Sequence, residues 1–427
     1  MTGRAERGPW PLPLRVYAAA TALLLRPAFA RASRKLGEQG VAEERRRERL
    51  GHATAARPAG RLVWFHAASV GESLSVLPLV ERAVGQAEVL VTTGTAASAE
   101  VMARRLPAGA RHHFAPLDAG GPVERFLDHW RPDLGIFVES EIWPVTLRRS
   151  AARGIPLVLM NARLSGGSLR AWGRAPRTAR AILRLFERIV AQTEDTRAAL
   201  VSLGAEPGRV TVGGNMKASA PPPPDDPAER AQLGTILGDA PLWAAISTHP
   251  GEEEAVLAAH AVVRERHPRA RLILVPRHPA RGTDVAELLR RHGFAVTRRS
   301  EGGEPVEAVW LADTMGETGL WFRLAPLAFL GGSLVPVGGH NPWEAAQCGA
   351  ALLIGPLRET VRTDVAALEA AGAARTVAGA EEMGAEVAHL LGDRAQLDGM
   401  REAGRALAEA QTGRADALAQ ELLGMLR

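Results

Sequence analysis

Three ionisable residues in the first half of the sequence follow short apolar runs, where the end of a strand can present side chains to a ligand. Glu72 comes after the run 61–65, Glu139 after 134–138 and Lys217 after 209–212. A carboxylate in such a place can take a proton from a hydroxyl nucleophile, and an ammonium can balance charge on a departing phosphate. Glu72 also opens a helical stretch, where a carboxylate interacts favourably with the helix dipole. Both interpretations of Glu72 are open at this point.

The acidic pair after the run 134–138 has an ambiguous geometry. Glu139 and Glu141 are two residues apart, so they point to the same side of an extended chain. They point to different sides if a helix begins there, and the pattern does not choose between the two.

Lysine is scarce in this chain. Of 52 basic residues, Lys35 and Lys217 are the two lysines and the rest are arginines. A compact ammonium differs chemically from a planar guanidinium, so Lys217 can have been retained as a point charge for a phosphate. The alternative is chance survival, for which Lys35 is a precedent.

Polar and glycine-rich stretches follow the strands expected in the second half. They are Pro276 and Arg277 after the run 272–275, Met315, Gly316 and Glu317 before a helix, and the stretch 331–340 leading into Asn341, Pro342, Trp343 and Glu344. Backbone N–H groups in glycine-rich loops and at helix starts suit a phosphate. Together these stretches predict a nucleotide site, although no Walker A motif, no strand followed by G-x-G-x-x-G and no H-E-x-x-H motif occurs.

The elements that must position these residues alternate between strand and helix. Strands are expected at 61–65, 88–91, 134–138, 156–160, 188–191 and 209–212, and again at 242–246, 272–275, 306–311, 327–330 and 351–354. This alternation is typical of parallel, doubly wound α/β domains. A proline-rich linker at 218–227 separates a domain at 51–217 from one at 228–427. We expect a cleft between them, with ligands beyond the carboxyl ends of the strands.

Composition excludes several classes. The 427 residues are 46% hydrophobic with 44 Gly, which excludes a wholly disordered or collagen-like chain. The single cysteine, Cys348, excludes an intrachain disulfide and an all-cysteine metal site. The net charge is +5, but residues 1–50 carry eleven basic and five acidic residues, so the rest of the chain sums to −1. A neutral body argues against nucleic acid as a partner.

The basic N-terminal segment, residues 1–50, contains an apolar run at 16–25 that is too short to cross a bilayer, which takes about 20 residues. Three interpretations compete. They are a signal peptide with an A-x-A site at 28–30, a helix in the membrane interface, and a helix packed on the protein body. We favour the second, with arginine and lysine on anionic headgroups.

Eight strings in these places resemble the 3-deoxy-D-manno-octulosonic acid (Kdo) transferases of lipopolysaccharide assembly. They are HAASVGE, ESEIWP, NARLS, GGNMK, STHPGEEE, VPRHPAR, DTMGETGLW and GGSLVPVGGHNPWEAA, in family order between residues 12 and 425. The resemblance implies an α/β GT-B glycosyltransferase with two Rossmann-like domains facing a central cleft. It also implies a location at the cytoplasmic face of the inner membrane, as a peripheral or N-terminally anchored protein. The implied reaction is inverting transfer of Kdo from CMP-Kdo to a lipid A precursor, with no metal and no cofactor.

The resemblance also assigns roles to residues. Glu72 corresponds to the catalytic base, and Glu139 and Lys217 to transition-state stabilisers. The CMP contacts would come from Pro276, Arg277, Met315, Gly316, Glu317, Asn341, Pro342, Trp343 and Glu344. Arg163 is a candidate partner for the sugar carboxylate on position alone. The sequence departs from the family at 357–361, LRETV, where a histidine and Asn-Phe are usual, and this bears on the donor side.

Three other functions fit parts of the pattern. One is a GT-B transferase for another CMP-activated acid sugar, for a UDP-sugar or for another glycolipid acceptor. The second is a sugar-nucleotide epimerase on the same fold, which has no use for a basic apolar N-terminus. The third is an inactive, membrane-attached nucleotide or glycolipid binder. The retained Glu72, Glu139 and Lys217 favour an active transferase.

Overall fold

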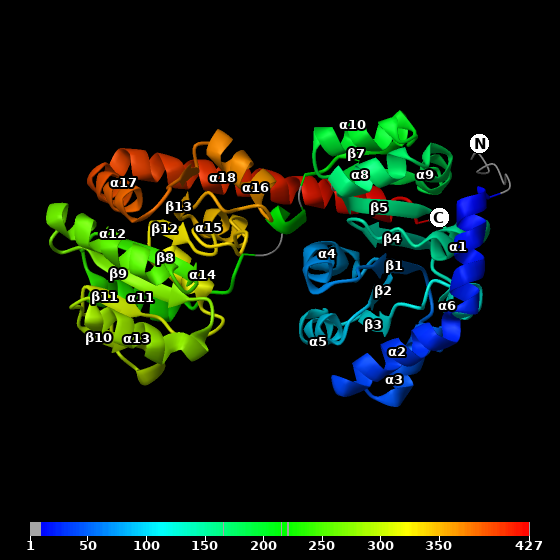
Figure 1. Cartoon of the computed structure of the whole chain (residues 1–427), viewed down its shortest axis with the longest axis horizontal. Coiled ribbons are helices and arrows are strands. Elements are labelled where there is room, and N and C mark those ends of the chain that lie inside the picture. The colour runs from blue at the N-terminus through cyan, green and yellow to red at the C-terminus, as the bar shows by residue number, and fades with distance from the viewer. Residues whose placement is uncertain (1–9, 165, 215, 220–221, 427) are drawn as a thin grey trace. The chain divides into compact units, whose positions relative to one another are not determined.

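The chain divides into two α/β units, each built on one parallel sheet (Figure 1). The structure, a computed structural model, describes residues 10–164, 166–214, 216–219 and 222–426. Unit 1 comprises Met1–Ala220 and Gln411–Arg427, and unit 2 comprises Pro221–Ala410. The boundary between residues 220 and 221 falls inside the proline-rich stretch 218–227. The expected second domain, 228–427, differs from unit 2 because residues 411–427 cluster with unit 1.

Unit 1 has, in its described part, a seven-stranded parallel sheet in the order β3-β2-β1-β4-β5-β6-β7. The strands are β1 (Leu62–His66), β2 (Glu88–Thr93), β3 (Ala110–Phe114), β4 (Leu134–Val138), β5 (Leu157–Ala162), β6 (Arg188–Ala191) and β7 (Val210–Val212). Strands β1, β4 and β5 are buried along their whole length, as expected for the middle of a parallel sheet covered on both faces. Strand order reverses at β1, so the carboxyl ends of β1 and β4 form the topological switch point.

Helices and turns cover this sheet (Figure 1). They are α1 (Leu12–Leu23), α2 (Leu25–Glu38), α3 (Glu43–Arg47), η1 (Glu48–Leu50), α4 (Val70–Ala83), α5 (Ala96–Arg105), α6 (Gly120–Trp130), α7 (Pro144–Ala152), α8 (Gly166–Gly173), α9 (Pro176–Leu183), α10 (Glu194–Ser202), η2 (Pro207–Arg209) and η3 (Met216–Ser219). Helix starts carry the expected caps. Thr95 accepts a hydrogen bond from the Ser98 N–H of α5, and Thr193 from the Thr196 N–H of α10.

The N-terminal helices belong to the folded body of unit 1. Helix α1 packs against α6 and α7, and Leu14 is buried in the apolar core. At the end of this region Glu48 is fully buried, where its carboxylate accepts a hydrogen bond from the Phe114 N–H (2.7 Å) and pairs with Arg45. Helix α1 therefore packs on the protein body through one of its faces. No helix in the described part of the chain is both long and apolar enough to span a bilayer.

Unit 2 repeats the architecture, with seven described parallel strands in the order β10-β11-β9-β8-β12-β13-β14. They are β8 (Leu242–Thr248), β9 (Arg271–Pro276), β10 (Val296–Arg298), β11 (Val309–Leu311), β12 (Leu327–Leu330), β13 (Ala351–Ile354) and β14 (Ala374–Thr376). The helices and turns are α11 (Pro227–Leu237), α12 (Glu252–Arg266), η4 (Pro279–Arg281), α13 (Gly282–Arg291), η5 (Arg299–Glu301), α14 (Thr318–Leu324), α15 (Trp343–Cys348), α16 (Arg362–Ala370) and α17 (Ala380–Gly392). Order reverses at β8, which lies between β9 and β12.

The last helix, α18 (Arg394–Leu423), contributes to both units, because its residues from Gln411 onward cluster with unit 1. Leu418, Ala419 and Leu422 are buried in the core cluster that also contains residues of β1, β2 and β4. Ion pairs fasten the same stretch, Arg188 to Glu421 at 2.8 Å and Arg82 to Asp416. The C-terminal stretch is thus an integral part of unit 1.

Candidate active site

Glu72 lies in the first turn of α4, just after β1, with its carboxylate folded back on the start of the helix. Its Oε2 accepts a hydrogen bond from the Ala68 N–H (2.7 Å), and its Oε1 accepts one from the Ser69 hydroxyl (3.0 Å). Ser69 is the N-cap residue, because its Oγ accepts from the Glu72 N–H (3.3 Å). The helix-start interpretation therefore describes this geometry correctly, and the remaining question is the electrostatics of the carboxylate.

Burial raises the pKa of Glu72, and the negative charge of Glu141 raises it further. The two hydrogen bonds from Ala68 and Ser69 act in the opposite direction, and Glu139 adds a smaller upward effect. A carboxylate with a raised pKa binds a proton more readily than an ordinary glutamate, as a general base requires. Glu72 therefore combines a helix-capping position with the electrostatics of a base.

Glu139 and Glu141 face different neighbours, which resolves the ambiguity left by their spacing. Glu139 has a left-handed backbone conformation (φ 56°), and its N–H donates to the Met160 carbonyl (2.8 Å). Its Oε1 accepts a hydrogen bond from the Asn161 side chain on β5 (3.4 Å). Glu141 lies toward β1 instead, where His66 Nε2 is 3.5 Å from its Oε2. The left-handed residue turns the chain between the two acids.

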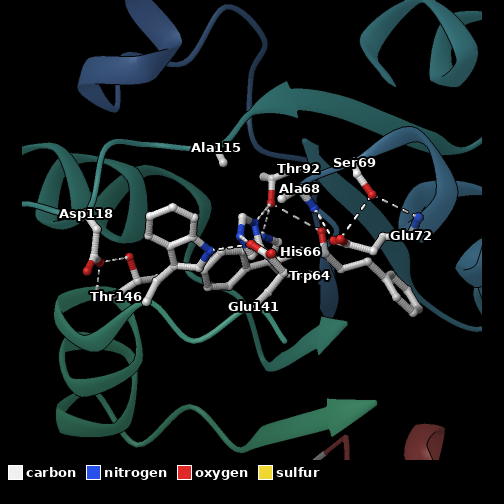
Figure 2. A network of polar contacts seen from close by, with 12 residues as sticks. Trp64, His66, Ala68, Ser69, Glu72, Thr92, Ala115, Asp118, Glu141 and Thr146 are labelled. Carbon is white, nitrogen blue, oxygen red and sulfur yellow. Dashed lines mark hydrogen bonds and ion pairs between the residues drawn. The ribbon is translucent and has the colours of Figure 1, made fainter. Parts of the chain in front are cut away.

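A polar network built on β1 and β2 holds Glu141 (Figure 2). The Thr92 hydroxyl accepts a hydrogen bond from Trp64 Nε1 (2.8 Å) and lies 2.9 Å from His66 Nδ1. The Trp143 indole donates to Glu141 Oε2 (2.6 Å). Although burial raises the pKa of Glu141, His66 and the Trp143 N–H together bring it below its usual value. Glu141 therefore stays ionised beside Glu72.

Replacing Glu141 with Gln should move the acidic limb of the pH profile to lower pH. If Glu72 is the base, it must be deprotonated to act, so kcat/KM should fall as pH drops through its pKa. Removing the charge of Glu141 makes the Glu72 carboxylate easier to ionise, which lowers that pKa. The measurement is kcat/KM against pH for wild type and variant. Glu81→Gln, on the exposed side of α4, is the matched control and should leave the profile in place. An unmoved limb in Glu141→Gln contradicts the coupling.

Asn161 joins the Glu139 carboxylate to the turn that carries Lys217. It is fully buried, has a left-handed conformation (φ 55°) and lies where the β5–β6 register shifts. Its Oδ1 accepts a hydrogen bond from the Met216 N–H (3.2 Å), at the first residue of η3. The side chain of Lys217 lies outside the described part of the structure, so its predicted role stays a prediction. The sequence analysis assigned no role to Asn161. Its residue type could have indicated a special backbone position, because asparagine tolerates left-handed conformations that most residues avoid.

In unit 2, the expected CMP contacts follow β9, β11 and β12, and the strands β9 and β11 are neighbours in the sheet. Arg277 is exposed at the end of β9, with its N–H on the Thr248 carbonyl (3.0 Å). Burial raises the pKa of Glu344, whereas a hydrogen bond from Asn341 and the charge of Arg277 oppose that rise. Arg277 and residues 341–344 therefore form one group. In the Met315–Glu317 stretch, which follows β11, Glu317 accepts a hydrogen bond from Arg299 (2.7 Å).

Pro342 and Trp343, two of the expected contacts, are buried. The Trp343 indole donates to Asp364 Oδ1 (3.0 Å) inside the unit. The Trp343 indole is therefore committed to the interior of the unit, and a role for Trp343 in binding CMP stays a prediction. Pro276, the last residue of β9, is buried as well, whereas Met315 and Gly316 are exposed.

The glycine-rich loop after β12 is organised by Glu252, which is fully buried. Its carboxylate accepts hydrogen bonds from the N–H groups of Gly332 (2.7 Å), Ser333 (3.0 Å) and Leu334 (2.9 Å). These three groups are therefore unavailable to a phosphate, and the expectation that this part of the loop binds one is wrong. Residues 357–361, where the sequence departs from the family, rest on the same loop. The Leu357 N–H donates to the Ser333 carbonyl (2.9 Å) and the Thr360 hydroxyl to the Gly338 carbonyl (2.7 Å).

Two histidines stack beside this loop. The rings of His249 and His340 are 5.1 Å apart with an interplanar angle of 11°, and their Nε2 atoms are 2.8 Å apart. Burial lowers the pKa of His340 to about 4, and the neighbouring His249 adds to this effect. The pair is therefore neutral near pH 7. No group of three or more His, Cys, Asp or Glu side chains in the described ranges is arranged to hold a metal ion, and metal independence stays a prediction.

Two parallel, doubly wound units with polar groups at their switch points are the architecture of the GT-B fold. A glycosyltransferase from Rickettsia africae aligns with a TM-score of 0.57 at 8% identity, over 86% of this chain and 99% of that one, and so supports the fold. A family model described as 3-deoxy-D-manno-octulosonic-acid transferase (kdotransferase) matches residues 44–220.

Two relatives identify the family. A probable mitochondrial 3-deoxy-D-manno-octulosonic acid transferase of Arabidopsis thaliana is 35% identical over 72% of each chain. The 3-deoxy-D-manno-octulosonic acid transferase of Haemophilus influenzae is 34% identical over 72% of this chain and 75% of its own. The chain belongs to the 3-deoxy-D-manno-octulosonic acid transferase family. The predicted family, GT-B fold and glycosyltransferase activity are confirmed.

Proposed function

We propose that this Kdo transferase moves Kdo from CMP-Kdo to a lipid A precursor, with inversion and without a metal ion. The observation that carries the proposal is the Glu72 carboxylate at the switch point of unit 1, where burial and Glu141 raise its pKa. A base of this kind suits an acceptor hydroxyl, which is a weak nucleophile until its proton is removed.

The proposed step is a single displacement. An acceptor hydroxyl oxygen attacks the anomeric carbon while a carboxylate oxygen of Glu72 takes its proton. The bond from the anomeric carbon to the phosphate oxygen breaks, and CMP leaves with the electron pair. Attack opposite the leaving group inverts the anomeric centre. Lys217 balances the developing phosphate charge, and Glu139, oriented by Asn161, balances positive charge on the sugar.

Direct transfer tests the reaction. The protein is incubated with CMP-Kdo and a lipid A precursor, and the lipid product is weighed by mass spectrometry. In a second experiment, a UDP-sugar replaces CMP-Kdo as the donor. In a third, the protein is first treated with a chelator. We expect a gain of one or more Kdo masses with CMP-Kdo in both treated and untreated protein. Transfer from the UDP-sugar alone supports another donor, and nucleotide binding without any mass gain supports the inactive binder.

We also propose that α1 lies on the cytoplasmic face of the inner membrane. Opposite the buried Leu14, this region exposes four large apolar residues: Leu12 (68% exposed), Val16 (58%), Leu23 (82%) and Leu24 (56%). Exposed basic residues accompany them, including Arg15 and Arg26. An apolar face bordered by arginine is the pattern of a helix in the interface of an anionic membrane.

Replacing Leu12, Val16, Leu23 and Leu24 together with Gln should weaken binding to anionic vesicles by at least about tenfold, because apolar burial drives the insertion. Sedimentation with phosphatidylglycerol vesicles measures this. Raising salt should weaken the wild type as well. Val306→Gln, at an exposed position of unit 2, serves as the control. Unchanged binding in the quadruple variant contradicts the proposed orientation.

A further inference from the structure

Helix α7, which follows the loop after β4, is capped by a residue from another segment. In the described structure, the side chain of its N-cap residue, Trp143, makes no capping hydrogen bond. Asp118, a buried residue between β3 and α6, supplies the cap instead. Its carboxylate accepts hydrogen bonds from the N–H groups of Val145 (3.1 Å) and Thr146 (2.7 Å) and from the Thr146 hydroxyl (2.6 Å) (Figure 2). These N–H groups belong to the first turn of a helix, where backbone donors lack partners in the helix itself, so Asp118 fixes the start of α7.

The start of α7 in turn determines where Trp143 lies. The Trp143 carbonyl accepts the first hydrogen bond of the helix, from the Leu147 N–H (2.9 Å), and its indole donates to Glu141 Oε2 (2.6 Å). The same indole packs edge-on against the His66 ring, with 6.3 Å between the ring centroids. Trp143 therefore connects the fixed end of α7 to the carboxylate whose charge raises the pKa of Glu72.

Helix α1 contacts this cap and the helix behind it. Burial raises the pKa of Tyr17, and the charge of Asp118, together with a hydrogen bond between the two side chains, raises it further. The guanidinium of Arg148, on α7, lies over the ring of Trp10, just before α1, at 4.3 Å from the ring centroid. Leu14 of α1 belongs to the same core cluster as residues of α7. The N-terminal helix therefore packs on both Asp118 and the helix that Asp118 caps.

We propose that Asp118 and Tyr17 are positioning residues, which hold the start of α7 so that Trp143 keeps Glu141 beside Glu72. This inference rests on the proposed role of Glu72 and deepens it, because it extends the support of the site to two other segments of unit 1. It also gives α1 a second role. The helix whose exposed face is proposed to meet the membrane orders the candidate active site through its packed face.

The charged groups around the two acids define what a displaced Trp143 changes. Glu72 faces Glu141 and, with a smaller effect, Glu139. Glu141 faces His66 and the Trp143 N–H, which together bring its pKa below the usual value. If α7 loses its cap, Trp143 holds Glu141 less firmly, so the negative charge acting on Glu72 weakens and the pKa of Glu72 falls. The acidic limb of kcat/KM then moves to lower pH, as expected for Glu141→Gln.

The pH dependence of kcat/KM tests the proposal. The donor is CMP-Kdo, and the acceptor is a lipid A precursor with short acyl chains, kept in solution as monomers so that membrane binding does not enter the measurement. The variants are Asp118→Asn and Tyr17→Phe, each alone and combined with Glu141→Gln. Asp128→Asn is the matched control, because Asp128 accepts a hydrogen bond from Arg153 (2.6 Å) at the opposite end of α7. Thermal unfolding checks that each variant is folded.

We expect Asp118→Asn to move the acidic limb to lower pH and to lower kcat by roughly tenfold, within the range of up to about 10²-fold that a small misplacement costs. Asparagine has the size of aspartate, but its amide nitrogen cannot accept a hydrogen bond from an N–H group. Tyr17→Phe should move the limb in the same direction by less. In the Glu141→Gln background neither change should move it further, because the charge through which both act is gone. The Asp128→Asn control should match the wild type.

Tyr17 is the single tyrosine of the chain, which gives a readout that needs no transfer assay. Protein isotope-labelled at the tyrosine Cζ has one NMR signal, and its chemical shift responds to the hydrogen bond of the phenol. Asp118→Asn should move this signal, because it changes the group beside the Tyr17 hydroxyl. Asp128→Asn should leave it in place. A signal that is the same in Asp118→Asn and in the wild type contradicts the contact between α1 and Asp118.

Two kinetic outcomes overturn the proposal. One is an acidic limb that stays in place in folded Asp118→Asn. The other is a limb that moves equally far with and without the Glu141 carboxylate, because the effect then bypasses it. If Asp118→Asn does not fold, Thr146→Val replaces it with the same expectations, since it removes one hydrogen bond from the same carboxylate. If the wild type transfers no sugar, the proposed function itself fails, whereas the NMR signal still decides whether Tyr17 contacts Asp118.

Discussion

Replacing Glu72 with Gln is expected to lower kcat by roughly 10²–10⁴-fold while leaving CMP binding intact. Glutamine has nearly the same shape as glutamate and can still accept the hydrogen bond from Ala68, but it cannot take a proton from the acceptor. The residues expected to hold CMP belong to unit 2, so the change should not alter nucleotide affinity. Single-turnover transfer measures the rate, and calorimetric titration with CMP measures binding.

A second variant separates the base from the helix cap. Ser69→Ala removes the hydroxyl that caps α4 but keeps the Glu72 carboxylate. It should cost about 1 kcal/mol of stability and retain most of the activity. If Glu72→Gln is as active as Ser69→Ala and loses similar stability, Glu72 is a capping residue and the proposed base is wrong.

Replacing Lys217 with Met should lower kcat by roughly 10²–10³-fold, the range for removing one preorganised group that stabilises developing charge. Replacing it with Arg should fail as well, although the charge is kept. A guanidinium is larger and planar, and it cannot take the place of a compact ammonium at one phosphate oxygen. The turn that carries Lys217 is held through Met216 by the buried Asn161.

Lys35→Arg is the matched control for the lysine argument. Lys35 is exposed on α2 and is the other lysine of the chain, so its exchange for Arg should leave transfer unchanged. Rates for the three variants come from the same CMP-Kdo assay. Full activity in Lys217→Arg would remove the argument from lysine scarcity, whatever Lys217→Met shows.

Much of the fold was predictable because buried parallel strands are uniform apolar runs. The runs at 61–65 and 134–138 correspond to β1 and β4, whose side chains are all buried. Strand β3 was not predicted, because its sequence ARHHF carries three polar residues and is only partly buried at the sheet edge. An edge strand pairs with one neighbouring strand and is less buried, so its sequence shows a weaker run of apolar residues.

The positions of the candidate catalytic residues were predictable, but their orientations were not. That two acids follow β4 is visible in the sequence, whereas the left-handed conformation of Glu139 that separates them is not. The pairing of Glu141 with His66 joins the loop after β4 to β1. Such contacts depend on strand order, which local patterns do not encode.

In the glycine-rich loop after β12, the sequence predicted a ligand contact that a distant side chain prevents. Its composition suggested N–H groups free for a phosphate, but Glu252, 80 residues before Gly332, accepts them. Glu252 stands in the first turn of α12, where an acid commonly serves as a partner of the helix dipole. The true partner of a buried carboxylate can be decided only when the segments around it are known.

The C-terminal stretch of α18 has a consequence for how the protein is made. Leu418, Ala419 and Leu422 complete a core whose other members lie in the first part of the chain. All of unit 2 is synthesised before these residues. Until they emerge from the ribosome, the core of unit 1 lacks the apolar side chains of Leu418, Ala419 and Leu422. Unit 2 is continuous in sequence, so it can fold before unit 1 is complete. The core of the unit that carries Glu72 is therefore completed last, once synthesis has passed Leu422.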